Sequence, residues 1–105
     1  MNYKERAQFR KSDAWHAFKA KCRLHTSTDF ITKEPLSKTW NLHHLDLNVR
    51  HYDDISDMDH FMPLNKKTHE MVHELYKLYH KDRKVLDRLK QVLDKMEELT
   101  DGKKG

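Results

Sequence analysis

The chain contains very little cysteine, glycine or proline. Its 105 residues include one cysteine, Cys22, and two each of glycine and proline. A single cysteine excludes an internal disulfide and any metal knuckle built from several cysteines, and it gives no reason to expect an oxidising compartment. We also find no repeat, linker or low-complexity segment. The sequence therefore predicts one domain over residues 1–105.

Long hydrophobic runs are missing as well. No apolar stretch approaches the roughly 20 residues that a membrane span needs. The first residues, Met1–Arg6, are charged and no apolar segment follows them, which argues against a signal peptide there. From these absences we expect a soluble, intracellular and cytoplasmic protein without a membrane partner.

Charged residues of both signs are abundant. They make up 36% of the chain and apolar residues another 36%, so the core must be small. A domain of this size buries only about 65% of its unfolded surface, and a bound metal would help to stabilise it. Lys and Arg number 21 against 17 Asp and Glu, a net charge of +4. That balance fits a nucleic-acid partner and fits ordinary solubility equally well.

Residues 1–40 predict one helix and a turn. Ser12 and Asp13 are typical of a helix start, and the apolar residues after them predict a short helix that ends near His25. Pro35 excludes a helix in the following segment, where we expect a turn with some extended structure.

Residues 41–80 predict two strands followed by a helix. The partial alternation in Trp40–Leu47 predicts the first strand, and the acidic segment 48–59 predicts a loop. A second short strand over 60–62 should stop at Pro63. The mixture of strands and helices gives an α+β fold class.

Two helices are expected at the C-terminal end. Asn65 is a typical cap for a helix that begins at Lys66, and Asp82 either caps a second helix or marks a bend. The second helix, over residues 82–100, carries a broad apolar stripe and ends at Gly102. The stripe fits packing on the domain's own core, and it leaves open a homodimer or another protein partner.

The histidines give the clearest chemical signal. His69 and His73 are four residues apart on a predicted helix, so both project from one face. Such a pair alone is more often a solvated helix face. His43 and His44 strengthen the signal, because neighbouring strand residues point to opposite faces. One can then face a metal held by the helix while the other flanks it. Two surface histidines on an edge strand remain an alternative explanation.

Three runs of residues together resemble a known family. These runs are Leu42–Leu45, His60–Leu64 and His69–His73, and they are similar to the HNH nucleases of the ββα-metal superfamily. The DNase domains of bacterial colicins are similar in ligand pattern, and the segments before the motif resemble those of phage and mobile-element members. The resemblance covers roughly residues 12–78. It implies a small ββα-metal motif flanked by an N-terminal helix and a long C-terminal helix.

The resemblance also implies roles for individual residues. His44 would be the general base that takes a proton from the attacking water. His43, His69 and His73 would hold one divalent ion, which could be Zn, Mg, Mn or Ni. The implied activity is an endonuclease that hydrolyses DNA phosphodiester bonds. His60 stands where the family carries an asparagine, which leaves three readings: it orients the loop and base, it binds metal, or it marks weakened activity.

Three basic residues are candidate contacts to the DNA backbone. Lys66 and Lys67 lie in the first turn of the predicted helix, where backbone N–H groups also attract phosphate. Arg50 lies in the predicted loop. For each of them an ordinary solvated side chain is the stronger explanation.

Two other functions use the same residues. His69, Glu70 and His73 match H-E-x-x-H, the zinc peptidase pattern in which the glutamate is the base. In the metzincin version of this pattern a glycine and then a third histidine follow, and here Tyr76 and Tyr79 occupy those two positions. The peptidase reading also leaves His43, His44 and His60 unexplained. A structural zinc module that binds DNA or a partner would use the same ligands and leave His44 without a catalytic role.

Overall fold

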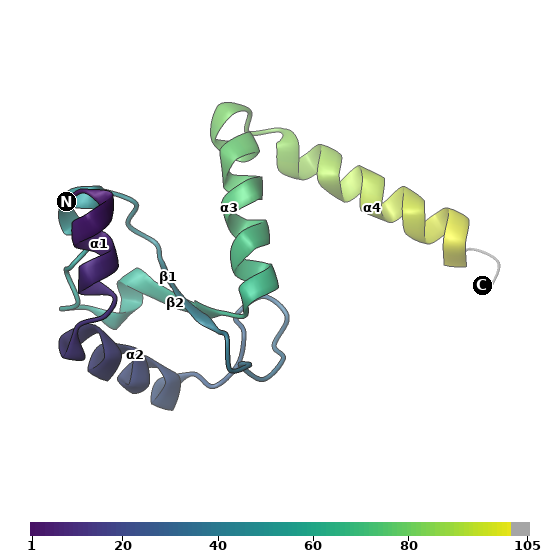
Figure 1. Ribbon diagram of the computed structural model, residues 1–105. Helices are drawn as coiled ribbons and strands as arrows, with labels where there is room; N and C mark the ends of the chain where they lie inside the picture. The colour runs from purple at the N-terminus through teal and green to yellow at the C-terminus, as the bar shows by residue number, and fades with distance from the viewer. Residues whose placement is uncertain (102–105) are drawn as a thin grey trace. The chain divides into compact units, whose positions relative to one another are not determined.

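The computed structural model describes residues 1–101 and contains α-helices, two short 3-10 helices and a two-stranded antiparallel sheet (Figure 1). The expected α+β class is confirmed. The chain divides into two compact units, Met1–Glu70 and Met71–Gly105, and the boundary falls inside helix α3 (Lys66–Lys81). The expected helix end at Gly102 lies outside the described residues.

The chain begins with two helices. Helix α1 (Tyr3–Phe9) was not predicted, and its N-terminus is stabilised by Asn2, whose side chain accepts a hydrogen bond from the Glu5 amide at 2.8 Å. Ser12 caps helix α2 (Asp13–His25), where the sequence predicts a helix start, and its hydroxyl accepts from the Trp15 amide at 3.2 Å. The same hydroxyl donates to the Phe9 carbonyl, so one residue joins the end of α1 to the start of α2.

Strands β1 (Asn41–His44) and β2 (Phe61–Leu64) form a hairpin. Their register pairs His43 with Met62 and Leu42 with Pro63. The expectation that the second strand stops at Pro63 is wrong. A proline at the edge of a two-stranded sheet loses no ladder hydrogen bond when its nitrogen faces outward, and its carbonyl here accepts from the Phe30 amide at 3.1 Å.

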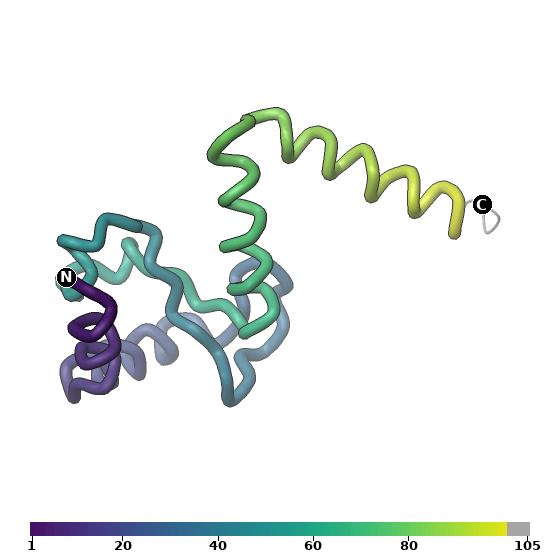
Figure 2. The backbone as a smooth tube through the Cα atoms, turned by 45° about the horizontal axis from the view of Figure 1, so that its top comes forward, coloured from purple at the N-terminus to yellow at the C-terminus, as the bar shows by residue number. Residues whose placement is uncertain are grey.

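The core of the first unit lies between α2 and one face of this hairpin. Figures 1 and 2 show α2 lying alongside the hairpin. Strand alternation turns every second side chain of β1 and β2 toward the helix. The buried apolar cluster joins residues far apart in sequence: Trp15, Phe18, Cys22, Leu36, Trp40, Leu42 and Phe61.

The second unit consists of the rest of α3 and helix α4 (Val85–Asp101). Asp82 lies in the turn between them, where its carboxylate accepts from the Lys84 amide at 3.0 Å and pairs with Arg88 at 2.7 Å. The sequence left open a cap or a bend at Asp82, and the structure ends α3 at Lys81 and begins a second helix. The apolar side chains of α4 from Leu86 to Leu99 are 39–68% exposed.

Candidate metal centre

Three histidines from two elements come together. His43 is on β1, and His69 and His73 are on α3. Each offers one ring nitrogen, and these three nitrogens lie within 4.8 Å of one another. The rings of His43 and His69 meet edge to face, with centroids 5.1 Å apart and planes inclined by 68°. Of the side chains that the structure describes, this is the group able to share a metal ion.

The local structure explains why these residues meet. His69 and His73 are one helical turn apart on a continuous helix and therefore share a face. His43 pairs with Met62 in the sheet, so its side chain leaves the hairpin on the face opposite the α2 core. His43 is buried, His69 is half-buried and His73 is exposed. The cluster thus extends from the interior to the surface.

His44 lies on the other face of β1. Its ring is stacked with the ring of Tyr52 at 4.4 Å and with that of Trp15 at 5.4 Å. The ring of Phe61 meets it edge-on at 4.8 Å. His44 is therefore held in an aromatic setting, and it does not add a nitrogen to the histidine cluster.

A hydrogen bond fixes the orientation and tautomer of His44. Its Nε2 lies 3.1 Å from the backbone carbonyl oxygen of Tyr52. A carbonyl oxygen only accepts, so Nε2 carries the proton and donates it, and in the neutral ring Nδ1 is the proton acceptor. Burial lowers the pKa of His44, the hydrogen bond to Tyr52 opposes that effect, and the charge of Arg10 lowers the pKa further. The net direction favours the neutral ring, the form that can accept a proton.

His60 lies outside the cluster. Its ring is exposed, with Nε2 3.7 Å from the Asp57 carboxylate, and it is not in the group able to share a metal. Its backbone has a clearer role, because its carbonyl accepts from the Leu45 amide at 2.9 Å and closes the hairpin just beyond the strands. The three readings of the His60 side chain stay open.

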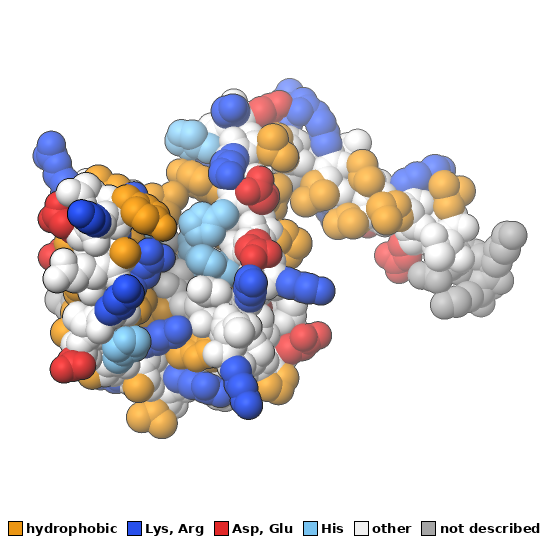
Figure 3. Space-filling model, viewed as in Figure 1, with side chains coloured by type: hydrophobic (Ala, Val, Ile, Leu, Met, Phe, Trp, Pro, Cys, Tyr) orange, Lys and Arg blue, Asp and Glu red, His pale blue; other side chains and the backbone are white. Residues whose placement is uncertain are grey.

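The predicted phosphate contacts are at the surface. Lys66 and Lys67 occupy the first turn of α3 and are exposed, and Arg50 is exposed in the 3-10 helix Val49–His51. Figure 3 shows histidine side chains reaching the surface on the face in view, among side chains of both charges.

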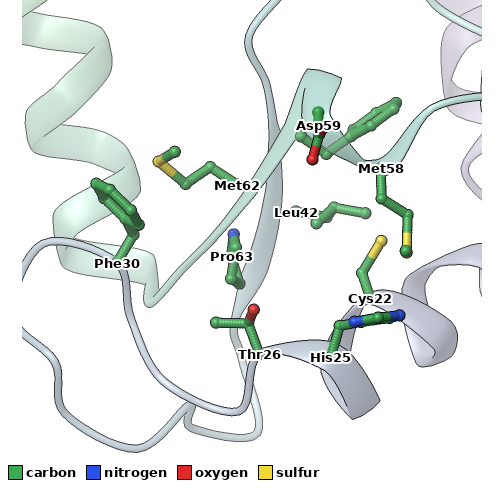
Figure 4. Close-up of a pocket in the computed structure, with 10 residues that line it drawn as sticks. Cys22, His25, Thr26, Phe30, Leu42, Met58, Asp59, Met62 and Pro63 are labelled. Atoms are coloured by element: carbon green, nitrogen blue, oxygen red, sulfur yellow. The ribbon is translucent and has the colours of Figure 1, made fainter.

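A separate pocket lies on the side of the hairpin near the end of α2. It has a volume of about 260 Å³, and Figure 4 shows Cys22, Leu42 and Met58 pointing toward it. The three clustered histidines are not among its lining residues. The pocket is thus distinct from the candidate metal centre.

Sequence reasoning missed the residues that hold His44. Trp15 was expected only as part of a helix, and Tyr52 lies in a loop without an apolar pattern. That loop is ordered by Asp46, whose carboxylate accepts from the Asn48 amide at 2.9 Å and lies 2.7 Å from Nδ1 of His51. Tyr52 holds His44 through its stacked ring and through its carbonyl. Every residue carries a carbonyl, so no sequence signal could have identified that contact.

Comparisons with protein-family models, with curated proteins and with solved structures give no match for this chain. None of the helices within residues 1–101 combines the length and the apolar character that crossing a membrane requires.

Proposed function

We propose that this protein is a metal-dependent endonuclease of the HNH type that hydrolyses phosphodiester bonds in DNA. The observation that carries the proposal is the convergence of His43, His69 and His73, with one ring nitrogen from each within 4.8 Å of the others. Three neutral imidazoles are a donor set that suits zinc and similar ions, and three protein ligands leave positions open for a substrate. Among the residues that the structure describes, this donor set therefore fits a catalytic site with positions left open.

In this proposal the histidines have two different roles, metal binding and proton transfer. His43, His69 and His73 hold the divalent ion, which when bound stabilises negative charge that develops on the phosphate and the leaving oxygen. His44 accepts a proton from the attacking water at Nδ1, because its Nε2 donates to Tyr52. The aromatic rings around His44 restrict its rotation, and burial lowers its pKa and so favours the neutral form.

DNA binding is assigned to exposed cations near the start of α3. Lys66 and Lys67 lie in its first turn, three and two residues before His69. Arg50, in the loop between the two strands, is a further contact to the DNA backbone.

A plasmid-nicking assay tests the proposal. Supercoiled DNA is incubated with the EDTA-treated protein, then with added Mg²⁺, Mn²⁺, Ni²⁺ or Zn²⁺. Nicking should require a metal, and His44→Ala should abolish it while metal binding is retained. His16→Ala is the control, because His16 is an exposed histidine on α2. Absence of nicking by the unmodified protein with every metal would refute the proposal.

One observation favours a second candidate, a zinc peptidase. The H-E-x-x-H pattern lacks a third ligand in sequence, and His43 supplies a third imidazole from the sheet. Glu70, the base in that case, is exposed on α3. Casein cleavage that is lost in Glu70→Gln would favour the peptidase. Metal binding without either activity would favour a structural zinc module.

A further inference from the structure

Asp29 is a buried carboxylate outside the acidic segment 48–59. Its side chain is 0% exposed, and it lies in the turn that follows α2. Burial of a carboxylate is unfavourable unless its oxygens accept hydrogen bonds. The contacts of Asp29 satisfy that requirement fully, and they connect segments that are distant in sequence.

Each oxygen of Asp29 accepts two hydrogen bonds. Oδ1 accepts from the backbone amides of Ile31 at 2.7 Å and Thr32 at 2.9 Å, which fixes the turn itself. Oδ2 accepts from the Asn65 amide at 2.8 Å and from the Thr68 hydroxyl. Asn65 directly precedes α3, and Thr68 lies in its first turn. The carboxylate thus takes the place of a helix cap and stabilises the positive end of the helix dipole.

Asn65 makes a second connection between the same segments. The sequence predicts that its side chain caps α3, but its Oδ1 accepts from the Ser37 amide at 2.8 Å and its Nδ2 donates to the Pro35 carbonyl at 3.1 Å. The side chain of Asn65 therefore bonds the turn to the start of α3. The carboxylate of Asp29 accepts the hydrogen bonds at the helix start instead. We call Asp29, Asn65 and Thr68 the Asp29 network.

The turn is also attached to the hairpin. The Phe30 amide donates to the carbonyl of Pro63 in β2 at 3.1 Å, and β2 pairs with β1 so that Met62 faces His43. One short turn is consequently bonded both to the sheet that carries His43 and to the first turn of the helix that carries His69. His69 directly follows Thr68, which is itself buried.

We infer that Asp29 is a positioning residue for the metal centre, and that it fixes the first turn of α3 against the hairpin so that His69 meets His43. The inference rests on the metal centre of the proposed function. Asp29 itself touches neither the metal ligands nor a substrate in this assignment. Loss of its carboxylate removes the acceptor of the Asn65 amide and leaves the Thr68 hydroxyl with the Asn65 carbonyl, 3.0 Å away, which loosens the helix start.

The test combines two measurements on full-length Asp29→Asn and Thr68→Val. Hydrogen exchange of the metal-free protein should rise about tenfold or more at residues 30–37 and at Asn65 and His69 while α2 keeps its protection. Co²⁺ affinity should fall about 10- to 100-fold, the usual effect of losing an outer partner, with a changed visible spectrum. Thr68→Ser keeps the hydroxyl and should restore both properties. Phe18→Leu lowers stability through the core alone and should leave the Co²⁺ spectrum unchanged.

The outcomes separate this inference from the proposed function. Unchanged exchange at Asn65 and His69 together with unchanged Co²⁺ affinity in both variants would overturn the role of Asp29. An equal loss of Co²⁺ affinity in Phe18→Leu and Asp29→Asn would also overturn this role, since that result would reflect a loss of stability only. If the unmodified protein bound no Co²⁺, the proposed metal centre would be refuted. Hydrogen exchange in the metal-free protein would still decide whether Asp29 stabilises the start of α3. Normal Co²⁺ binding without DNA cleavage would refute the nuclease alone.

Discussion

Nε2 of His44 lies 3.1 Å from the backbone carbonyl oxygen of Tyr52, and this contact determines which nitrogen of the ring can accept a proton. Because Nε2 is the donor, Nδ1 is left as the base. The ring is also stacked on Tyr52, with centroids 4.4 Å apart. The loop between the strands therefore sets both the tautomer and the orientation of the proposed base.

This assignment predicts the Nε2–H tautomer for His44 at neutral pH. Nitrogen chemical shifts of the imidazole, measured by NMR, should show a protonated Nε2 and an unprotonated Nδ1. Tyr52→Phe keeps both the carbonyl and the stacked ring, so it should retain the tautomer and nearly all nicking activity. A His44 ring protonated on Nδ1 alone would rule out the proposed proton transfer.

Lys66 is predicted to contact a DNA phosphate. Lys66→Ala should weaken DNA binding about equally for all sequences, and should reduce the slope of log affinity against log salt by about one unit. The matched control is Lys90→Ala, since Lys90 pairs with Asp94 on α4. Fluorescence anisotropy at several salt concentrations measures the slope. An unchanged slope in Lys66→Ala would remove Lys66 from the interface.

Trp15 is predicted to be the most costly core residue of α2 to truncate. It is 6% exposed and contacts Phe9, Phe18 and Phe61. Trp15→Ala should lower the free energy of unfolding by about 3–5 kcal/mol, measured by urea denaturation. Leu24→Ala on the same helix is the control, because Leu24 is 89% exposed, and it should change stability by about 0.5 kcal/mol or less. Similar losses in both variants would contradict the packing described here.

Asp29 is predicted to make stability depend on acidity. Burial raises its pKa, but the hydrogen bonds from Thr68, Thr32, Asn65 and Ile31 more than compensate and lower the pKa from 3.8 to about 2. A depressed pKa stabilises the folded state above about pH 4, and that contribution is lost as the pH falls toward 2. Asp29→Asn should be less stable than the unmodified protein at pH 6, with a difference that shrinks below pH 4. A difference that does not vary between pH 6 and pH 2.5 would contradict this linkage.

Much of the fold follows from local patterns in the sequence. Ser12 before an apolar run predicted α2, the four-residue spacing of His69 and His73 predicted their shared helix face, and a cap or bend was expected at Asp82. These features depend on nearest neighbours along the chain. Helix α1 was missed because it has seven residues and no buried side chain, so hydrophobic periodicity carries no signal for it.

The parts that could not be predicted depend on contacts distant in sequence. Asp29 lies 36 residues from Asn65 and 39 from Thr68, and nothing in its neighbourhood marks it as buried. Tyr52 acts through a backbone carbonyl and through a ring stacked on His44. The direction of His44 depends on packing against Trp15 from α2. The sequence could therefore indicate which residue types meet at the centre, but not what holds them there.

Zinc binding by the three histidines is the central claim, and isothermal titration calorimetry of the metal-free protein tests it most directly. The unmodified chain should bind one Zn²⁺, and His43→Ala, His69→Ala and His73→Ala should each lower the affinity by more than the 10- to 100-fold typical of an outer partner. His80→Ala, on the same helix but outside the cluster, should bind like the unmodified protein. No Zn²⁺ binding by the unmodified protein, or equal affinities in all four variants, would contradict the account.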